Sequence, residues 1–149
     1  MSTLEILGHA AIALLLGAVI GIERELADKP AGLRTHMLVA GAAALLVSLG
    51  DILLSFFTVN SSSTIQSDPI RIVEAVITGV SFLGAGTILR RRKAGEVEGL
   101  TTAASLLFVA VIGICVGLSE VMLAIGATML ALVTLSGVKL LEKWLKDTR

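Results

Sequence analysis

Five long apolar stretches, separated by short polar connections, are the feature that most constrains how this chain can fold. Each is close to the twenty or so residues that an α-helix needs to cross the hydrocarbon core of a bilayer. Of the 149 residues, 55% are hydrophobic and only 16% are charged, whereas about a quarter of a soluble domain is charged. The sequence therefore predicts an all-α, polytopic membrane bundle of about five transmembrane helices.

The predicted membrane spans cover, in chain order, about residues 6–22, 35–57, 69–89, 100–117 and 121–138. A signal peptide is the alternative for the first span, but no positively charged segment precedes it and charged residues follow it directly. We therefore interpret it as a retained helix. Apolar residues recur on one face of 139–147, around Trp144, which predicts an interfacial helix after the last span. The whole chain, residues 1–149, is expected to form one membrane domain.

The basic residues predict how the bundle is oriented. Eleven of the twelve lysines and arginines fall in the first connection, the third connection and the C-terminal tail, which lie on one side of the membrane if there are five spans. Only Arg71 falls on the other side. The positive-inside rule then places the N-terminus outside and the C-terminus in the cytoplasm. The acidic residues left outside would either concentrate cations there or simply be the remainder of this sorting.

The third span carries polar residues that a helix facing lipid does not need. Spacings of three and four residues place Arg71, Glu74, Thr78, Ser81 and Ala85 on one stripe, with Val73, Val76, Val80 and Leu83 on the face expected to meet lipid. The second span has a similar stripe of small and polar residues: Gly41, Ala44, Ser48, Asp51 and Ser55. We expect the two stripes to pack together, with the third span at the centre of the bundle.

Asp51 and Glu74 are the residues most suggestive of chemistry, because a charge inside a membrane normally has a partner or a wet cavity. One interpretation is a cation or proton site formed by Asp51, Glu74 and His9. The other is an ion pair of Arg71 with Glu74 or Asp51. Two carboxylates in a wet vestibule would bind Mg²⁺ only weakly, and no other cofactor is expected.

The remaining candidates favour packing over chemistry. His36 is expected to be a solvated interfacial residue. Thr101 and Thr102 are expected either to cap the fourth span or to bond a neighbouring helix, and capping is the default. The motifs Gly17-x-x-x-Gly21 and Gly113-x-x-x-Gly117 permit close helix contact, within one chain or between two, and Cys115 is expected to pack in the core. Because no nucleophile–base pair, phosphate-binding loop or nucleic-acid surface is found, we expect neither an enzyme nor a nucleic-acid binder.

Three stretches together resemble the MgtC/SapB family of bacterial membrane proteins. They are GIERELADKPAGLRTHMLVAGAAAL (21–45), DPIRIVEAVITGVSFLGAGTILR (68–90) and VEGLTTAASLLFVAVIGICVG (97–117). The motif residues carried onto this chain are Glu23, Arg24, Gly32, Arg34, Thr35, Asp68, Arg71, Gly84, Gly86, Thr101 and Thr102. The chain departs from the family pattern at Ala75, where Gln is frequent, and at Leu107, where Trp is frequent. Long members also have a C-terminal cytoplasmic domain, which is not expected within these 149 residues.

The resemblance implies a multi-pass protein of the bacterial inner membrane, linked to low magnesium, acid stress and survival inside host cells. It implies action through other membrane proteins, including the rotary ATP synthase. The alternative is a transporter or channel for Mg²⁺ or another cation that uses Asp51 and Glu74. Since five short helices with glycine-rich faces bury little alone, we expect a homodimer.

The topology can be tested directly. A reporter fused at Ser62, in the second connection, should report the outer side of the membrane, because that connection contains no lysine or arginine. A cytoplasmic signal from Ser62 would contradict five spans with the N-terminus outside.

Overall fold

The described part of the chain folds into a bundle of five α-helices. The structure, a computed structural model, describes residues 2–60, 70–90, 92–93, 96–97 and 99–137. Its elements are α1 (Thr3–Leu26), α2 (Leu33–Asn60), α3 (Ile70–Arg90), the paired two-residue strands β1 (Arg92–Lys93) and β2 (Glu96–Val97), α4 (Leu100–Gly117) and α5 (Val121–Leu132). A π-helical turn, Val133–Gly137, continues α5.

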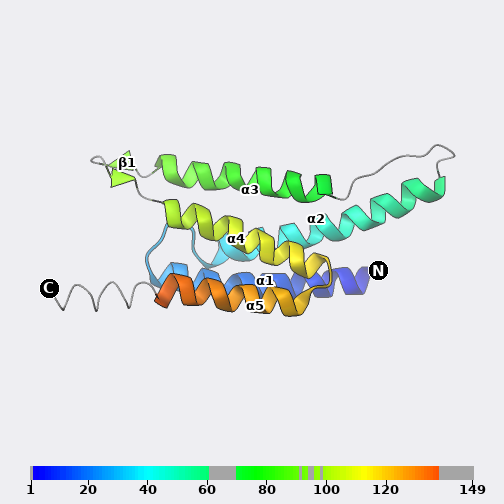
Figure 1. Ribbon diagram of the computed structural model, residues 1–149, viewed down its shortest axis with the longest axis horizontal. Coiled ribbons are helices and arrows are strands. Elements are labelled where there is room, and N and C mark those ends of the chain that lie inside the picture. The colour runs from blue at the N-terminus through cyan, green and yellow to red at the C-terminus, as the bar shows by residue number, and fades with distance from the viewer. Residues whose placement is uncertain (1, 61–69, 91, 94–95, 98, 138–149) are drawn as a thin grey trace.

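Successive helices run in opposite directions (Figure 1), which confirms the predicted all-α bundle. The first four, α1 to α4, are each long and apolar enough to cross a membrane, and the apolar helix Val121–Gly137 is shorter. Residue 138 and the predicted interfacial helix 139–147 lie outside the described residues.

The connections between α1 and α2 and between α3 and α4 lie at the same end of the bundle (Figure 1). We call this the basic end, because Arg24, Lys29 and Arg34 belong to its first connection. The first helix begins at the opposite end, where Ser2 and Glu5 form a capping box. The basic residues of the first connection therefore share an end with β1, which consists of Arg92 and Lys93, as predicted. The side of the membrane that this end faces stays a prediction.

One side of α2 is held against α1 by glycines. A Cβ atom added to Gly17 would lie 2.6 Å from the backbone oxygen of His36, and one added to Gly21 would lie 2.7 Å from the Cα of Leu33. Both distances are too short for a real carbon atom. The two backbones therefore approach as closely as they do only because these positions have no side chain.

The other side of α2 is held against α4 in the same way. A Cβ atom on Gly113 would overlap the carbonyl oxygen of Ala40, and one on Gly117 would lie 2.8 Å from that of Ala44. The close-contact prediction for both glycine motifs is confirmed, and the contacts lie within one chain. We call this arrangement, with α2 between Gly17/Gly21 and Gly113/Gly117, the glycine clamp.

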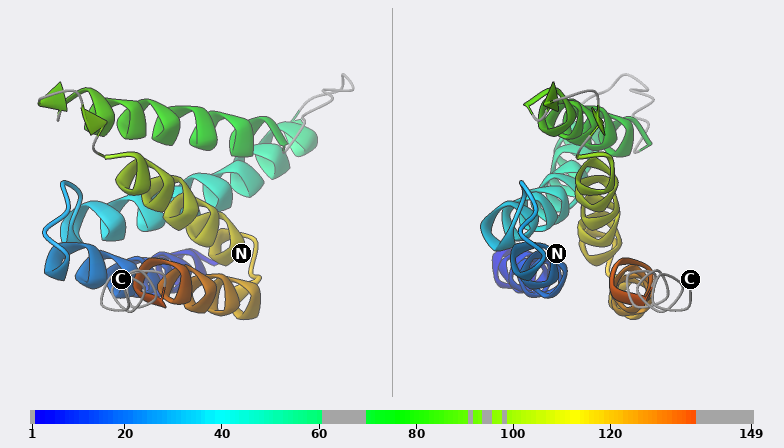
Figure 2. Two further views of the ribbon diagram at one scale, coloured as in Figure 1. Left: turned by 60° about the vertical axis from the view of Figure 1, so that its left-hand side comes forward. Right: turned by 90° about the vertical axis from the view of Figure 1, so that its left-hand side faces the viewer.

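The centre of the bundle is the junction of α1, α2 and α4, and α3 lies at its edge (Figure 2). The prediction that the third span occupies the centre is therefore wrong. On the small stripe of α2, Gly41 lies against Leu14 of α1 and Ala44 lies against Gly117 of α4, and Ser48 is buried. Cys115 packs in this core, as predicted.

The orientation predicted for the third span is also reversed. Val76 and Val80 are buried against the core, whereas Arg71, Glu74 and Thr78 are exposed. The reason lies in the glycine clamp, because α1 and α4 already occupy the small face of α2. The branched valines of α3 then supply the apolar area that packs against the rest of the bundle, beside the contact of Gly84 with Ala103.

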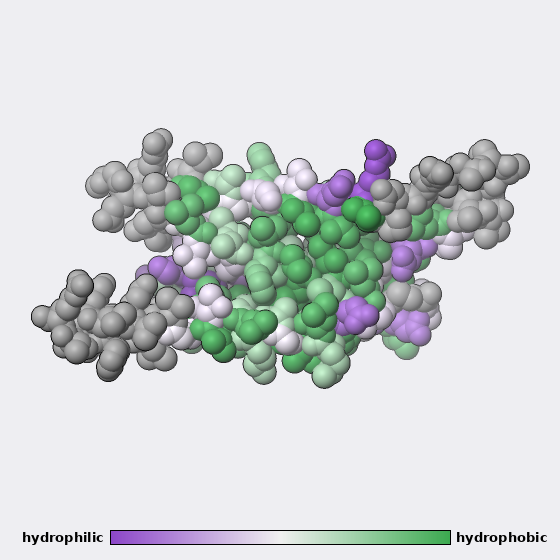
Figure 3. Space-filling view, in the orientation of Figure 1, coloured by the Kyte–Doolittle hydropathy of each residue, from purple (hydrophilic) through white to green (hydrophobic). Residues whose placement is uncertain are grey.

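The outer surface of the bundle is strongly apolar. Its middle is covered by hydrophobic residues, and the hydrophilic residues gather mostly toward its ends (Figure 3). Exposed side chains include Leu15, Leu38, Phe82, Met122 and Leu130, at 60% or more of their accessible area. Exposed apolar surface on this scale is expected where lipid is the solvent.

The glycine clamp can be tested by adding one methyl group. Gly113→Ala should lower the free energy of unfolding by about 1–3 kcal/mol, because the methyl group overlaps the backbone of α2. The measurement is reversible unfolding in detergent micelles. Gly126→Ala, on α5, is the matched control because no atom lies within 4 Å of its added Cβ. An equal response of both variants would contradict the clamp.

Candidate functional site

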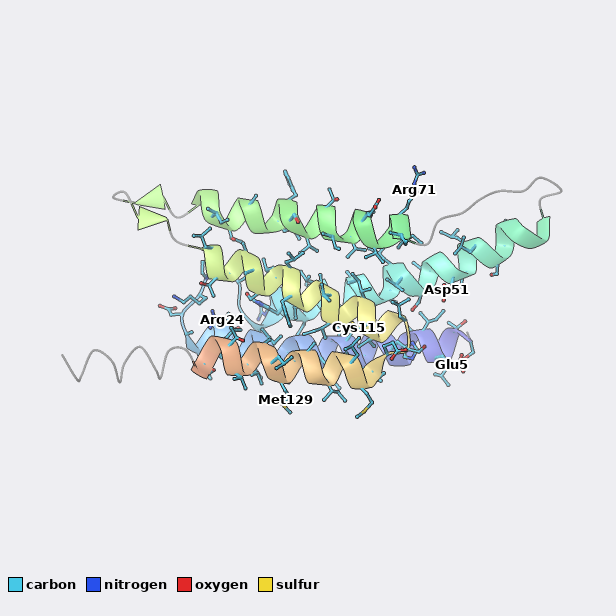
Figure 4. The ribbon with its side chains drawn as sticks, in the orientation of Figure 1. Glu5, Arg24, Asp51, Arg71, Cys115 and Met129 are labelled. Atoms are coloured by element: carbon cyan, nitrogen blue, oxygen red, sulfur yellow. The ribbon has the colours of Figure 1, made fainter. Side chains whose placement is uncertain are left out.

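Six polar residues gather at the basic end, where α1, α2 and α4 meet. We call them the polar cluster: Glu23, Arg24, Glu25, His36, Thr102 and Ser105. Three of them are almost completely enclosed, since Arg24 and Thr102 are 1% exposed and His36 is 0% exposed. The labelled Arg24 lies at this end of the bundle, while Glu5, Asp51 and Arg71 lie toward the other (Figure 4).

His36 joins α2 to α4. Its Nδ1 lies 2.9 Å from the carbonyl oxygen of Gly32, and its Nε2 lies 3.0 Å from the hydroxyl oxygen of Ser105. The prediction of a solvated interfacial histidine is therefore wrong. Gly17 and Gly21 let α2 approach α1 so closely that the imidazole is covered.

The hydrogen bonds of His36 fix the arrangement of protons. A carbonyl oxygen can only accept, so Nδ1 carries a hydrogen and donates it to Gly32. The Ser105 hydroxyl also lies 2.9 Å from the carbonyl oxygen of Thr102. Because a hydroxyl has one hydrogen, Ser105 donates to His36 Nε2 when the ring is neutral and is free to donate to Thr102 when the ring is doubly protonated.

Arg24 is the most deeply buried charge of the described residues. Its Nε donates to the carboxylate of the neighbouring Glu23, which is half-buried. Its Nη2 has no hydrogen-bond partner within the described part of the chain. A buried charge is tolerated only when paired, so the carboxylate of Glu23 is what permits arginine at this position.

Glu25 connects the end of α1 to the start of α2. Its Oε2 accepts a hydrogen bond of 2.7 Å from the backbone N–H of Leu33, the first residue of α2. A negative carboxylate at a helix N-terminus is favourable both as a cap and toward the helix dipole. A Cβ on Gly32 would lie 2.7 Å from this same oxygen, so a side chain there would displace the carboxylate of Glu25 from the N–H of Leu33.

The other motif residues at the basic end differ in exposure. Arg34, Thr35 and Thr101 are exposed, whereas Thr102 is buried. The capping role predicted for Thr101 and Thr102 is wrong, because Gly99 is the N-cap of α4 and makes no side-chain cap bond. Gly99 has φ = 93° and its backbone lies against Thr87 of α3, a combination that disfavours any residue with a side chain.

The remaining motif residues are Gly84, Gly86, Arg71 and Asp68, which belong to α3 or directly precede it. Gly84 packs against Ala103 of α4, while Gly86 is exposed and no described side chain or neighbouring helix lies within 4 Å of a Cβ added to it. Arg71 is exposed at the far end of α3 and points away from the bundle (Figure 4). Asp68 lies outside the described residues.

The structure does not assemble the predicted cation site. His9 is half-buried on α1, and Asp51 and Glu74 are exposed on α2 and α3. Among the described residues no three His, Cys, Asp or Glu side chains could hold one metal ion. Neither of the predicted ion pairs of Arg71 forms in that part of the chain either. Weak Mg²⁺ binding itself stays a prediction.

A groove of about 440 Å³ between α4 and α5 reaches the polar cluster. Its lining is mostly apolar and carries three hydroxyl groups, those of Thr101, Ser105 and Thr134. Thr134 belongs to the π-helical turn, and such turns occur often at functional sites. One wall of the cluster is therefore reached from the outside of the bundle at Ser105.

The sequence did not predict the roles of three members of the polar cluster, Glu25, His36 and Ser105. Glu25 lies beside two motif residues, and Ser105 stands three residues after Thr102 in the stretch GLTTAAS, on the same helical face. That spacing was the available signal for Ser105. No pattern in one sequence brings His36 next to Ser105, because the two are 69 residues apart.

The apolar surface, the four long helices and the polar cluster at one end define a multi-pass helical membrane protein. The sequence profile of the MgtC family matches residues 10–144. The chain therefore belongs to the MgtC family.

Several curated relatives are about 40% identical to the chain. It is 41% identical to protein MgtC of Salmonella typhimurium over 120 residues, which are 80% of this chain and 46% of that protein. It is 40% identical to protein SrpB of Synechococcus elongatus, covering 92% of this chain and 78% of SrpB. YhiD of Escherichia coli, named as a candidate magnesium transporter, is 39% identical over 83% of this chain and 58% of its own length.

The chain thus spans about half the length of some of the relatives that it matches, including MgtC. No solved structure matches it.

Two buried serines provide a test of the polar cluster. Ser105→Ala should lower the free energy of unfolding by about 1–3 kcal/mol, because the buried imidazole of His36 loses its hydrogen-bond partner on α4. Ser48→Ala should be neutral or stabilising, since the hydroxyl of Ser48 is 1% exposed and has no partner among the described residues. Unfolding of both variants in the same micelles measures this. Equal losses would contradict the assigned role of Ser105.

Proposed function

We propose that this protein is a non-enzymatic protein of the bacterial inner membrane that adapts the cell to low magnesium or acid stress by modulating partner membrane proteins. Membership of the MgtC family and the name of YhiD, a candidate magnesium transporter, support the link to magnesium. The rotary ATP synthase is one candidate partner, and survival inside host cells is one setting in which such a role would matter.

The observation that carries the proposal is the division of the motif residues at the basic end. Arg24 and Thr102 are enclosed, and Glu23 is half-buried and bonded to Arg24. These residues hold the helix ends together. Arg34 and Thr35 have no such task, because both are exposed on the first turn of α2.

Exposed polar residues of a motif, held on a rigid buried base, are suited to contact another protein. Under the predicted orientation this surface faces the cytoplasm. A positively charged Arg34 there would meet an acidic or carbonyl-rich surface of a partner at the inner face of the membrane.

A cation transporter remains the second candidate, and one observation favours it. Asp51 lines a cavity of about 200 Å³ at the end of the bundle opposite the polar cluster, together with apolar residues of α2, α3 and Leu118. The purified protein in liposomes tests this candidate. Mg²⁺ or proton flux that disappears in Asp51→Asn would replace partner modulation by transport as the function.

The partner-binding surface is tested by a pair of variants in a strain lacking the chromosomal copy. Arg34→Ala combined with Thr35→Ala should impair growth in low magnesium and reduce recovery of crosslinked membrane partners by about tenfold, the effect of losing roughly 1.4 kcal/mol of binding energy. Lys29→Ala is the matched control, because Lys29 is exposed in the same connection and is not a motif residue.

The amount of protein in the membrane is measured in parallel. Since both altered side chains are exposed, it should equal that of the unmodified protein. Normal growth of the double variant at normal protein level would contradict the proposal. So would an equal defect in Lys29→Ala, which would assign the effect to net positive charge alone.

A further inference from the structure

The exposed face of α3 is the part of the structure whose residues fit their surroundings least. Of the four long helices, α3 is the least buried. In its apolar 18-residue stretch 17% of the residues are buried, against 56% in that of α4. Its buried face carries valines, and its exposed face carries Arg71, Glu74 and Thr78. Lipid would solvate the opposite arrangement better, because charged and hydroxyl-bearing side chains are costly against hydrocarbon.

The charges on this face have no partner among the residues that the structure describes. Neither Arg71 nor Glu74 makes a hydrogen bond or ion pair in the part of the chain that the structure describes. Each is close to the end of α3, and Glu74 is four residues into the helix, about 6 Å along its axis. The face therefore offers one positive and one negative charge at nearly the same depth.

The positions of these residues around the helix make the face complementary to itself. Arg71 and Glu74 are separated by about 60° around the axis, and Thr78 and Ala85 lie between those two directions. We call Thr78 and Ala85 the seam. Arg71 lies on one side of the seam and Glu74 on the other. Both seam residues are exposed.

Two copies inserted in the same direction are related by a two-fold axis along the membrane normal, so their α3 helices run parallel. Such an axis puts the cationic flank of one helix beside the anionic flank of the other, on both sides of the seam. We infer that α3 is the contact between two copies of this chain, with Arg71 of each copy paired to Glu74 of the other across Thr78 and Ala85.

The rest of the face permits this contact. Phe82 is 82% exposed beside the seam and supplies apolar contact area. Because α3 lies at the edge of the bundle (Figure 2), a second copy reaches it without meeting α1 or α5.

Disulfide crosslinking of the full-length protein in native membranes locates the contact. Thr78→Cys, in a Cys115→Ala background, should give a covalent dimer on oxidation. Leu83→Cys is the matched control on the same helix, since Leu83 is 53% exposed but lies away from the seam. Dimer from both variants, or from neither, would overturn the inference. A disulfide-independent photocrosslink from position 78 to a different protein, without homodimer, would also overturn it.

Charge reversal tests the pairing itself. Arg71→Glu alone and Glu74→Arg alone should each weaken dimerisation in liposomes at least about tenfold, because like charges then meet on both sides of the seam. The double variant, which exchanges the two charges, should restore it. Mixing the two single variants should also give a mixed dimer. Dimerisation that is unaffected by the single changes, or that the double change does not restore, would overturn the pairing.

Discussion

The approach of α2 to both of its neighbours is the constraint on which the rest of the structure depends. Helices in lipid gain little from hiding apolar side chains from each other, so close backbone contact has to hold them together. Gly17 and Gly21 provide it on one side of α2, and Gly113 and Gly117 on the other. The enclosed imidazole of His36, the central place of α4 and the peripheral place of α3 all follow from those four positions.

The polar residues of the chain fall into two classes that a sequence motif does not separate. Arg24, Glu25 and His36 bond within the bundle and fix how α1, α2 and α4 end or begin. Arg34 and Arg71 are exposed at opposite ends of it. The first class explains why the fold requires these residues. The second class makes no bond among the residues that the structure describes, so its members are where interaction with other molecules is to be sought.

Sequence reasoning predicted the helices well because their signal is local. The number of helices, the bounds of α4 and both glycine motifs follow from runs of residues within one span. What failed was the direction in which a helix faces. The stripe of Glu74 and Thr78 was expected to face inward because polar residues in membranes usually do, but the small face of α2 is already taken by glycines of α1 and α4. The enclosure of His36 and its bond to Ser105 depend on that same choice of neighbours.

The hydrogen bond between His36 and Ser105 joins two residues that are synthesised at different times, because Ser105 follows His36 by 69 residues. When the hairpin of α1 and α2 enters the membrane, 69 residues separate His36 from the hydroxyl that it will bond. Until α4 is inserted, His36 lacks its bond to Ser105, and the face of α2 that contacts Gly113 and Gly117 has no partner helix. Insertion of α4 closes both at once, so the mature arrangement of the first two helices is completed late in synthesis, and a chain interrupted before Ser105 cannot reach it.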